Sequence, residues 1–241
     1  MSFKRFIQIL FSGQIAAMNP SQWPDQYELY WLKCLQSEKG KKEFDDYIKG
    51  LNNDKINKEW TKKSATELCD LTYKKCYAIC YTKSRDSELM WRAYSDNNKS
   101  IMISTTEDKV RSLGNNYSAG YYYLKEIQYD LEERGSFTEF LERMNIYPGS
   151  VGYDDFDEWF LHKRKCFNYE EEVRLVVLPD DLNARNGEKI MIYIPVLSDF
   201  IDEVMVNPLA KDEHVELTNK ICTHFGIPFQ GRSQIYDFER E

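Results

Sequence analysis

The stretch Cys166-Phe-Asn-Tyr-Glu-Glu-Glu-Val-Arg-Leu-Val-Val-Leu178 joins a run of acidic residues directly to a run of β-branched and other apolar residues. The apolar run is typical of a mostly buried strand. Because side chains alternate along a strand, we expect Glu170, Glu172 and Arg174 on the same face. Two carboxylates beside a guanidinium at the mouth of a strand form either an ion-pair brace or part of a site.

The composition describes an ordered chain with an excess of acidic groups. The chain has 241 residues, an aromatic content of 15% and a formal net charge of −8. This length allows a substantial core, and the net charge argues against extended binding to duplex nucleic acid. No apolar run is long enough to span a bilayer, and the first ten residues lack the features of a signal peptide. We therefore predict a cytoplasmic protein with no membrane partner.

The cysteines and histidines do not show the spacing of a metal site. None of the six cysteines forms a Cys-x-x-Cys pair, and the three histidines are scattered. Without a secretion signal, reduced thiols are the simplest interpretation. We predict no metal.

Apolar periodicity and turn signals predict a chain that mixes helices with strands. Helices are expected over residues 2–11, 25–34, 37–57, 60–75, 86–94, 106–114, 136–144, 154–163 and 211–225. Strands are expected over residues 14–18, 77–82, 100–104, 121–129, 189–195 and 201–206, after Tyr169, and near the C-terminus over 233–236. The predicted class is α+β, with a mixed, largely antiparallel sheet flanked by helices. We treat residues 1–241 as one domain and residues 37–75 as a candidate helical insertion.

The segment from Asn19 to Glu28 contains two prolines and predicts a fixed turn. Asp25 and Glu28 are the acidic groups that this turn presents. Their spacing fits a capping box, in which Asp25 caps a helix and Glu28 reaches back to it. The alternative is that Asp25 contributes directly to a binding site.

A second segment, Glu88-Leu-Met-Trp-Arg-Ala-Tyr-Ser-Asp96, combines aromatic and charged residues on a predicted helix. Trp91 or Tyr94 could stack on a base or a nicotinamide ring, with Arg92 on a phosphate. The alternative places the aromatic side chains in the core and pairs Arg92 with Asp96 on the surface.

The acidic run itself also has two interpretations. A carboxylate there could stabilise a cationic transition state or bind the hydroxyls of a ribose. Alternatively, an ion pair with Lys163 or Arg174 fixes the edge of the sheet. Three adjacent acids repel one another, so nearby cations or a ligand must compensate them.

Four segments, taken in order, resemble motifs of a bacterial family known as domain of unknown function 2971, and abortive-infection proteins of the AbiG type resemble the same family. They are Leu10 to Glu28, with its Asn-Pro-Ser turn; Cys80 to Asp96, ending Met-Trp-Arg-Ala-Tyr-Ser-Asp; Lys163 to Arg174, with its Tyr-Glu-Glu-Glu-Val-Arg; and Ile201 to Pro208. Together they extend over nearly the whole chain.

The layout of that family resembles ADP-ribosyltransferases, in which a late glutamate holds a ribose and supports an oxocarbenium-like transition state. The resemblance implies NAD as a substrate, Glu172 or Glu170 as the acid, and Tyr94 or Trp91 as the stacking group. The other residues expected to bind substrate are Arg92, Asp96, Lys163, Tyr169, Arg174 and Asp25.

We therefore expect a bacterial defence or toxin-type effector that acts on NAD or another nucleotide, with ADP-ribosyl transfer as its reaction. The alternative is a non-catalytic module that binds a nucleotide or a protein partner. Two departures from the family favour this alternative. Ala93 and Asn98 stand where the family has histidines, and its opening strand has no counterpart here.

Overall fold

The computed structural model describes most of the chain, and every structural statement below concerns the part that it describes. This part comprises residues 1–23, 25, 27–30, 33–34, 37–50, 76–95, 97–117, 120–130, 137–143, 160–179 and 187–237. Several predictions fall partly or wholly elsewhere: the helix over 60–75, most of the helix over 154–163, parts of the helices over 25–34, 37–57 and 136–144, and the position of Asp96.

The first helix and strand form as their sequence predicts. Helix α1 (Phe3–Ser12) begins after Ser2, whose hydroxyl accepts a hydrogen bond from a backbone N–H one turn later. It ends at Gly13, which has a φ of 63° and donates its N–H to Ile9. Strand β1 (Gln14–Met18) follows directly. Its alternating burial places one face on the core.

The larger sheet has five strands, all antiparallel, in the order β4-β5-β2-β1-β6. Their bounds are β4 Gly120–Glu126, β5 Glu172–Pro179, β2 Tyr77–Thr82 and β6 Lys189–Tyr193. The acidic run thus leads into β5, which lies between β4 and β2. All eight residues of β5 are buried, so the predicted buried strand is confirmed.

A smaller sheet contains three strands, in the order β3-β7-β8. They are β3 (Ile101–Ser104), β7 (Glu203–Val206) and β8 (Phe229–Arg232). The β3–β7 pair is antiparallel, and the β7–β8 pair is parallel. The α+β class and the mostly antiparallel pairing are therefore confirmed, but the strands divide between two sheets.

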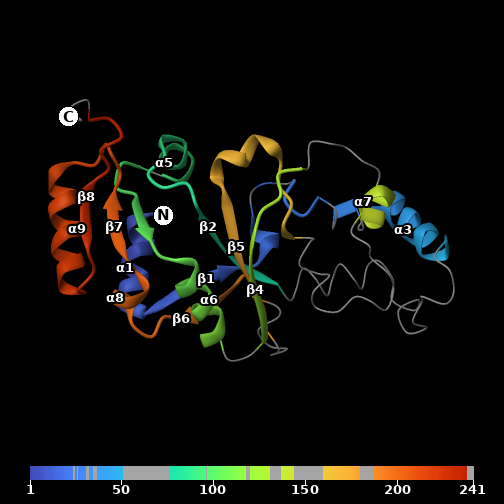
Figure 1. The fold of residues 1–241 in the computed structure, drawn as a ribbon, viewed down its shortest axis with the longest axis horizontal. Coiled ribbons are helices and arrows are strands. Elements are labelled where there is room, and N and C mark those ends of the chain that lie inside the picture. The colour runs from blue at the N-terminus through green and yellow to red at the C-terminus, as the bar shows by residue number, and fades with distance from the viewer. Residues whose placement is uncertain are drawn as a thin grey trace.

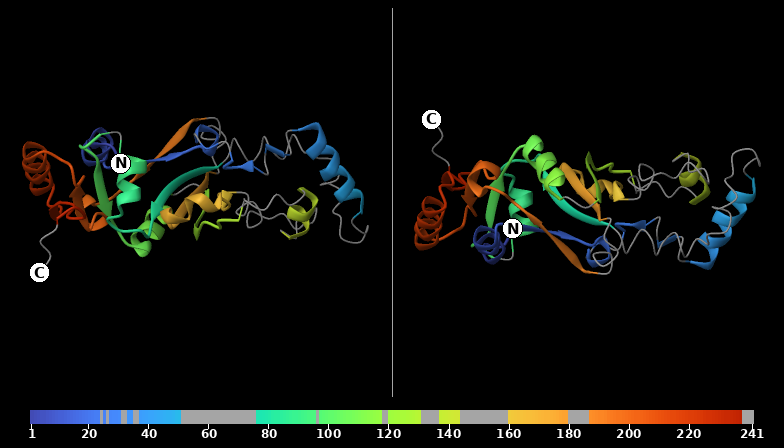
Figure 2. Two further views of the ribbon diagram at one scale, coloured as in Figure 1. Left: turned by 90° about the horizontal axis from the view of Figure 1, so that it is seen from above. Right: turned by 90° about the horizontal axis from the view of Figure 1, so that it is seen from below.

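The helices surround these sheets and extend beyond them (Figure 1). They are α3 Glu38–Gly50, α5 Glu88–Tyr94, α6 Glu107–Asn116, α7 Phe137–Arg143, α8 Leu197–Phe200 and α9 Asp212–His224, with short 3₁₀ turns η1 Pro20–Gln22 and η5 Lys165–Glu170. Helix α9 lies beside β8 at one end of the molecule. Helices α3 and α7 lie together at the opposite end, as both further views show (Figure 2).

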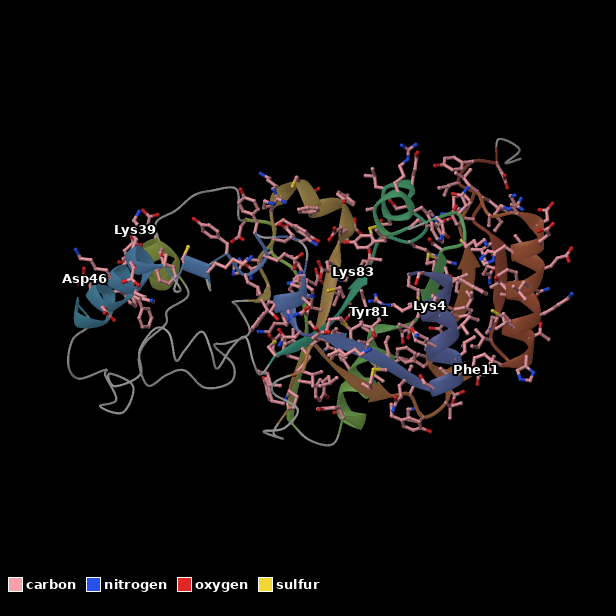
Figure 3. The ribbon with its side chains drawn as sticks, turned by 180° about the vertical axis from the view of Figure 1, so that it is seen from behind. Lys4, Phe11, Lys39, Asp46, Tyr81 and Lys83 are labelled. Atoms are coloured by element: carbon pink, nitrogen blue, oxygen red, sulfur yellow. The ribbon has the colours of Figure 1, made fainter. Side chains whose placement is uncertain are left out.

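The molecule is therefore elongated. Lys39 and Asp46 of α3 project at the end farthest from Lys4 and Phe11 of α1 (Figure 3). Helix α3 falls in the predicted insertion over 37–75, whose residues 51–75 lie outside the described part. The insertion stays a prediction.

Two element predictions are wrong. Residues 160–163, expected to end a helix, are not helical beyond Phe160, and His162 pairs with Gln128 in an isolated parallel bridge. Burial explains the difference. A surface helix buries only one of its faces, whereas three consecutive residues are buried here, Phe160, Leu161 and His162.

The terminal strand, expected over 233–236, is β8 and ends at Arg232. Gly231, with a φ of 89°, interrupts the alternation and conceals the strand in the sequence.

The main core fills the space between the larger sheet, the smaller sheet and helices α1 and α6. Its members include Phe6, Leu10, Tyr77, Ile101, Leu113, Leu175, Ile192 and Val204. No helix in the described residues is long and apolar enough to cross a membrane. The cysteines described, Cys34, Cys76, Cys80, Cys166 and Cys222, are free thiols.

Candidate functional site

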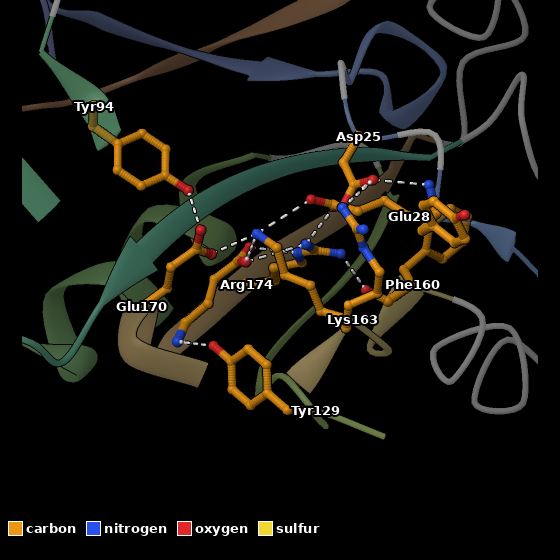
Figure 4. Close-up of polar contacts among 11 residues, drawn as sticks. Asp25, Glu28, Tyr94, Tyr129, Phe160, Lys163, Glu170 and Arg174 are labelled. Carbon is orange, nitrogen blue, oxygen red and sulfur yellow. Dashed lines mark hydrogen bonds and ion pairs between the residues drawn. The ribbon is translucent and has the colours of Figure 1, made fainter. Parts of the chain in front are cut away.

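Lys163 lies at the centre of a buried group of charged side chains (Figure 4). Its Nζ contacts carboxylate oxygens of Glu28 at 3.2 Å, Glu170 at 2.5 Å and Glu172 at 3.1 Å. One ammonium thus holds three carboxylates, of which Glu28 is distant in the sequence from the other two. Such an arrangement is stable only when the charges compensate one another, since each has lost its water.

Arg174 completes this group from the same face of β5 as Glu172. Its Nε donates to Glu172 at 2.6 Å, one Nη donates to Glu28 at 2.6 Å, and the other donates to the backbone oxygen of Phe160 at 2.6 Å. The guanidinium also stacks over the ring of Trp23 at 4.2 Å. The Arg174 side chain is only 1% exposed, so all of its donors must be satisfied within the protein.

We call Glu28, Lys163, Glu170, Glu172 and Arg174 the charge cluster. The two acids of the motif reach it from different elements. Glu170 is the last residue of η5, whereas Glu172 begins β5, and Glu171 between them has a φ of 42°. The expected convergence of the two acids is therefore present. The expected cause is wrong, because a 3₁₀ turn with a left-handed cap brings them together and the strand starts only at Glu172.

Tyr94 connects helix α5 to the charge cluster. Its hydroxyl donates to Glu170 Oε1 at 2.7 Å, and the side chain is half-exposed. On the other side, the Tyr129 hydroxyl accepts the backbone N–H of Glu172 at 2.8 Å. Tyr94 is thus the most exposed side chain of this network, and Tyr129 is partly buried.

Trp91 and Arg92, on the same helix as Tyr94, do not join the cluster. The Trp91 ring is buried, and its Nε1 donates to Asp86 at 2.8 Å. Arg92 pairs with Glu88 at 2.6 Å and is largely exposed. Of the three residues predicted on this helix, the structure brings only Tyr94 to the acids.

The loop before Glu28 is held differently from the predicted capping box. The Asp25 carboxylate accepts the N–H of Tyr27 at 2.9 Å and pairs with Arg164 at 3.3 Å. Glu28 binds Lys163 and Arg174 with its two oxygens and does not reach back to Asp25. The capping-box interpretation is therefore wrong for Glu28, which is a central member of the charge cluster.

Aromatic side chains accompany the cations of this region. The Arg164 guanidinium lies 4.3 Å from the ring of Tyr27 and 5.0 Å from that of Phe167, and Lys163 Nζ lies 4.9 Å from the latter. Tyr169 packs near Phe167, with ring centroids 6.4 Å apart. Cation–π contacts of this kind favour a fixed arrangement of the cations.

The two acids of the motif have opposite electrostatic properties. Burial raises the pKa of Glu170, although Lys163 and Tyr94 act against it. Burial also acts to raise the pKa of Glu172, but Arg174 and then Lys163 outweigh it and lower this pKa to about 2. Glu172 thus stays ionised near neutral pH, and Glu170 is the more readily protonated of these two acids.

The formal charges of the cluster support this assignment. Three carboxylates and two cations leave one negative charge in a buried position. A proton on Glu170 would remove it. Burial and the bond to Glu170 also raise the pKa of Tyr94, so its hydroxyl remains a donor over the working pH range.

Sequence reasoning missed two contributors, Glu28 and Tyr129. Glu28 was noticed only as a capping partner, and nothing in the sequence marks Tyr129. In the described residues, no group of three or more histidine, cysteine or acidic side chains is arranged to hold a metal ion. A shallow hollow over β4, lined by Arg111 and residues 121–125, does not include the charge cluster.

The comparisons with known proteins point to one family. A family model described as "Protein of unknown function (DUF2971)" matches residues 90–175. This stretch contains Tyr94, Lys163, Glu170, Glu172 and Arg174, so it includes the whole charge cluster except Glu28. The match supports the predicted family, whose description gives no activity. Neither the curated proteins nor the solved structures gave a match.

Proposed function

We propose that this chain, which matches a family of unknown function over residues 90–175, is a cytoplasmic effector that acts on NAD or another nucleotide. Its reaction would be transfer of ADP-ribose, in a bacterial defence or toxin setting. The setting and the reaction come from the resemblance to AbiG-type proteins and to ADP-ribosyltransferases. The site would be the charge cluster together with Tyr94.

One observation carries the proposal: two carboxyl groups with opposite pKa shifts share the ammonium of Lys163, and a half-exposed tyrosine binds one of them. Paired acids whose environments separate their pKa values are typical of sites that combine proton transfer with charge stabilisation. Cleavage of a bond to ribose needs both, because positive charge develops on the sugar.

The roles follow from position. Tyr94 is the exposed edge of the network, so a ribose hydroxyl would approach from its side and replace the Tyr94 hydroxyl on Glu170. As the bond between the ribose and nicotinamide breaks and nicotinamide leaves, the acceptor would bond to the ribose carbon. Glu170 would take the acceptor's proton, because its raised pKa makes it the better base. Glu172 would stay ionised and favour the cationic transition state. Lys163 would hold both acids in place.

A non-catalytic binding module is the second candidate, and a specific observation favours it. Both oxygens of Glu28, of Glu170 and of Glu172 already bind groups of the protein. A fully paired cluster can act as a structural brace between the loop at Glu28, η5 and β5. Its surroundings would then bind a nucleotide or a protein partner without chemistry.

NAD turnover by the purified protein separates the two candidates. We expect Glu170→Gln and Glu172→Gln each to reduce turnover by about a hundredfold or more, the usual effect of losing an acid–base group. Glu216→Gln, an exposed change on α9, is the matched control and should leave turnover intact. Unchanged turnover in both cluster variants would reject the catalytic assignment.

A thermal-shift titration tests binding independently of turnover. A nucleotide that binds the folded state raises the Tm by mass action. A shift with NAD that disappears in Tyr94→Phe would place the nucleotide beside Tyr94. A shift without any turnover would favour the binding module instead.

A further inference from the structure

Helix α5 is anchored at its beginning by Asp86. One carboxylate oxygen of Asp86, Oδ1, accepts hydrogen bonds from Trp91 Nε1 at 2.8 Å and from the hydroxyl of Ser233 at 2.5 Å. Trp91 belongs to α5, whereas Ser233 follows β8 near the C-terminus. A single side chain therefore joins the helix that carries Tyr94 to a segment 147 residues away.

Further contacts attach α5 to the same part of the molecule. The Tyr236 hydroxyl donates to Glu88 at 3.2 Å, and Asn207 donates from the end of β7 to the hydroxyl of Ser95 at 3.0 Å. Both ends of α5 are thus bound to residues that directly follow strands of the smaller sheet, Asn207 after β7 and the segment from Ser233 after β8. Tyr94 extends from this helix in the other direction, to Glu170 beside the larger sheet (Figure 4).

The backbone is unusual on both sides of the Tyr94–Glu170 contact. Asp86 has a φ of 46°, and Glu171 has a φ of 42°. Residues other than glycine seldom adopt this left-handed region, although aspartate tolerates it better than most. Such conformations persist only where surrounding contacts hold them, which agrees with the bonds from Trp91 and Ser233.

We propose that Asp86 is a positioning residue for Tyr94, through which the C-terminal segment Ser233–Asp237 holds the tyrosine hydroxyl against Glu170. Ser233 and Trp91 both donate hydrogen bonds to the Asp86 carboxylate, which fixes the position of the start of α5. The position of α5 in turn places the Tyr94 hydroxyl at Glu170. The consequence for nucleotide binding rests on the function proposed above. The positioning itself does not, because it can be observed without a ligand.

The backbone and the carboxylate of Asp86 can be separated by two substitutions. Asp86→Gly removes the side chain but accepts the left-handed conformation without strain. Asp86→Asn keeps an oxygen acceptor and also tolerates this conformation. We therefore expect Asp86→Asn to retain much of the positioning and Asp86→Gly to lose it. Ser233→Ala, which removes only one donor, should lie between them.

The measurement is the ¹³Cζ resonance of Tyr94 in protein labelled at tyrosine, which senses the hydrogen bond of the hydroxyl. Tyr94→Phe identifies the signal, and Glu170→Ala supplies the position of a tyrosine that has lost its acceptor. In Asp86→Gly, the Tyr94 signal should move toward this reference position. The signals of tyrosines distant from α5 should not move, which distinguishes a local effect from unfolding.

Nucleotide affinity then tests the functional consequence. If NAD raises the Tm of the wild-type protein, the Kd for NAD should be about tenfold larger in Asp86→Gly, as expected for one lost hydrogen bond. Asp86→Asn should restore most of the affinity. A moved Tyr94 signal with no NAD binding in any variant would support the positioning and reject the nucleotide site.

The positioning proposal fails if the Tyr94 signal in Asp86→Gly coincides with that of the wild type while the protein remains folded. It also fails if Asp86→Asn and Asp86→Gly displace the signal equally, because the carboxylate oxygen would then have no particular role. If Asp86→Gly does not fold, Ser233→Ala provides the test instead. An unchanged Tyr94 signal in Ser233→Ala would then overturn the positioning proposal.

Discussion

At the scale of single residues, the opposite pKa shifts of Glu170 and Glu172 imply two separate dependences of stability on pH. Glu172 has a folded-state pKa of about 2, below the ordinary value of 4.5. Its contribution is therefore present above pH 4.5 and is lost as the pH falls toward 2. Glu170 has a raised pKa, so its contribution is present below pH 4.5 and is lost as the pH rises through its folded-state pKa.

We expect urea unfolding at several pH values to separate these contributions. Between pH 4.5 and 2, the free energy of unfolding should fall by about 3 kcal/mol less in Glu172→Gln than in wild type. This difference follows from the size of the pKa shift. In wild type, the contribution of Glu170 to the free energy of unfolding is lost as the pH rises above 4.5, and this loss should be absent in Glu170→Gln. Parallel stability profiles for both variants and wild type would contradict the assigned directions.

Arg174 gives a second prediction at this scale. Arg174→Met would leave Glu28 and Glu172 buried beside a single cation, Lys163. We expect the free energy of unfolding to fall by about 3–5 kcal/mol, the usual cost of breaking a buried ion pair from one side. Arg111→Met, which removes an exposed arginine of α6, is the matched control and should change stability little.

If the charge cluster is only a brace, its members should be replaceable together. Changing Glu28, Glu172 and Arg174 jointly to apolar residues of similar volume should then recover most of the stability lost in Arg174→Met. If nucleotide binding or turnover is lost in the triple variant while stability returns, the charges have a function beyond bracing. If the triple variant loses as much stability as Arg174→Met, the hypothesis that the charge cluster is only a brace is contradicted.

The residues of the cluster were only partly predictable. The sequence indicated that cations must compensate the acidic run, and Lys163 and Arg174 do so. It could not indicate Glu28, because the bond from Arg174 to Glu28 spans 146 residues. The choice between a capping role and a buried ion pair for that glutamate depends on which strand lies above the loop, and no local pattern encodes this.

At the scale of elements, predictions succeeded where one local pattern acts alone. Strands β1 and β2 have the predicted bounds, since alternation and turn residues define them. The stretch 165–171 was less predictable. An acidic run at a strand mouth has the period of a strand, yet contacts to Lys163 and the left-handed Glu171 close a 3₁₀ turn instead. Tertiary contacts decided this boundary.

Strand β5 supports a prediction of its own. Leu175 is fully buried in β5, an inner strand of the larger sheet, whereas Met191 lies on the exposed side of the edge strand β6. We expect Leu175→Ala to lower the free energy of unfolding by about 2–5 kcal/mol, through lost burial and the cavity it leaves. Met191→Ala should cost well under half of that. Comparable losses, measured by urea unfolding, would show that the two strands are not buried as described.

At the scale of the whole molecule, polar contacts join the two sheets in addition to the hydrophobic core that they share. Tyr94 binds Glu170 across this junction, and Arg85, which follows β2, pairs with Glu203 of β7 at 2.7 Å. The seven-residue helix α5 lies on this path and buries only Trp91. Short elements with little buried surface open locally at low free energy, whereas buried strands exchange only through global unfolding.

Native-state hydrogen exchange should therefore find α5 less protected than β5. Removing the Tyr94 hydroxyl in Tyr94→Phe should speed exchange in α5 further, by a factor of about 5–10 for the loss of one hydrogen bond, and leave β5 unchanged. Equal acceleration in both elements would mean that the hydroxyl stabilises the molecule globally. Tyr94 joins α5, which the smaller sheet holds, to Glu170 beside the larger sheet. Faster exchange in α5 alone would therefore show that the Tyr94 hydroxyl stabilises α5 locally, at the junction of the two sheets.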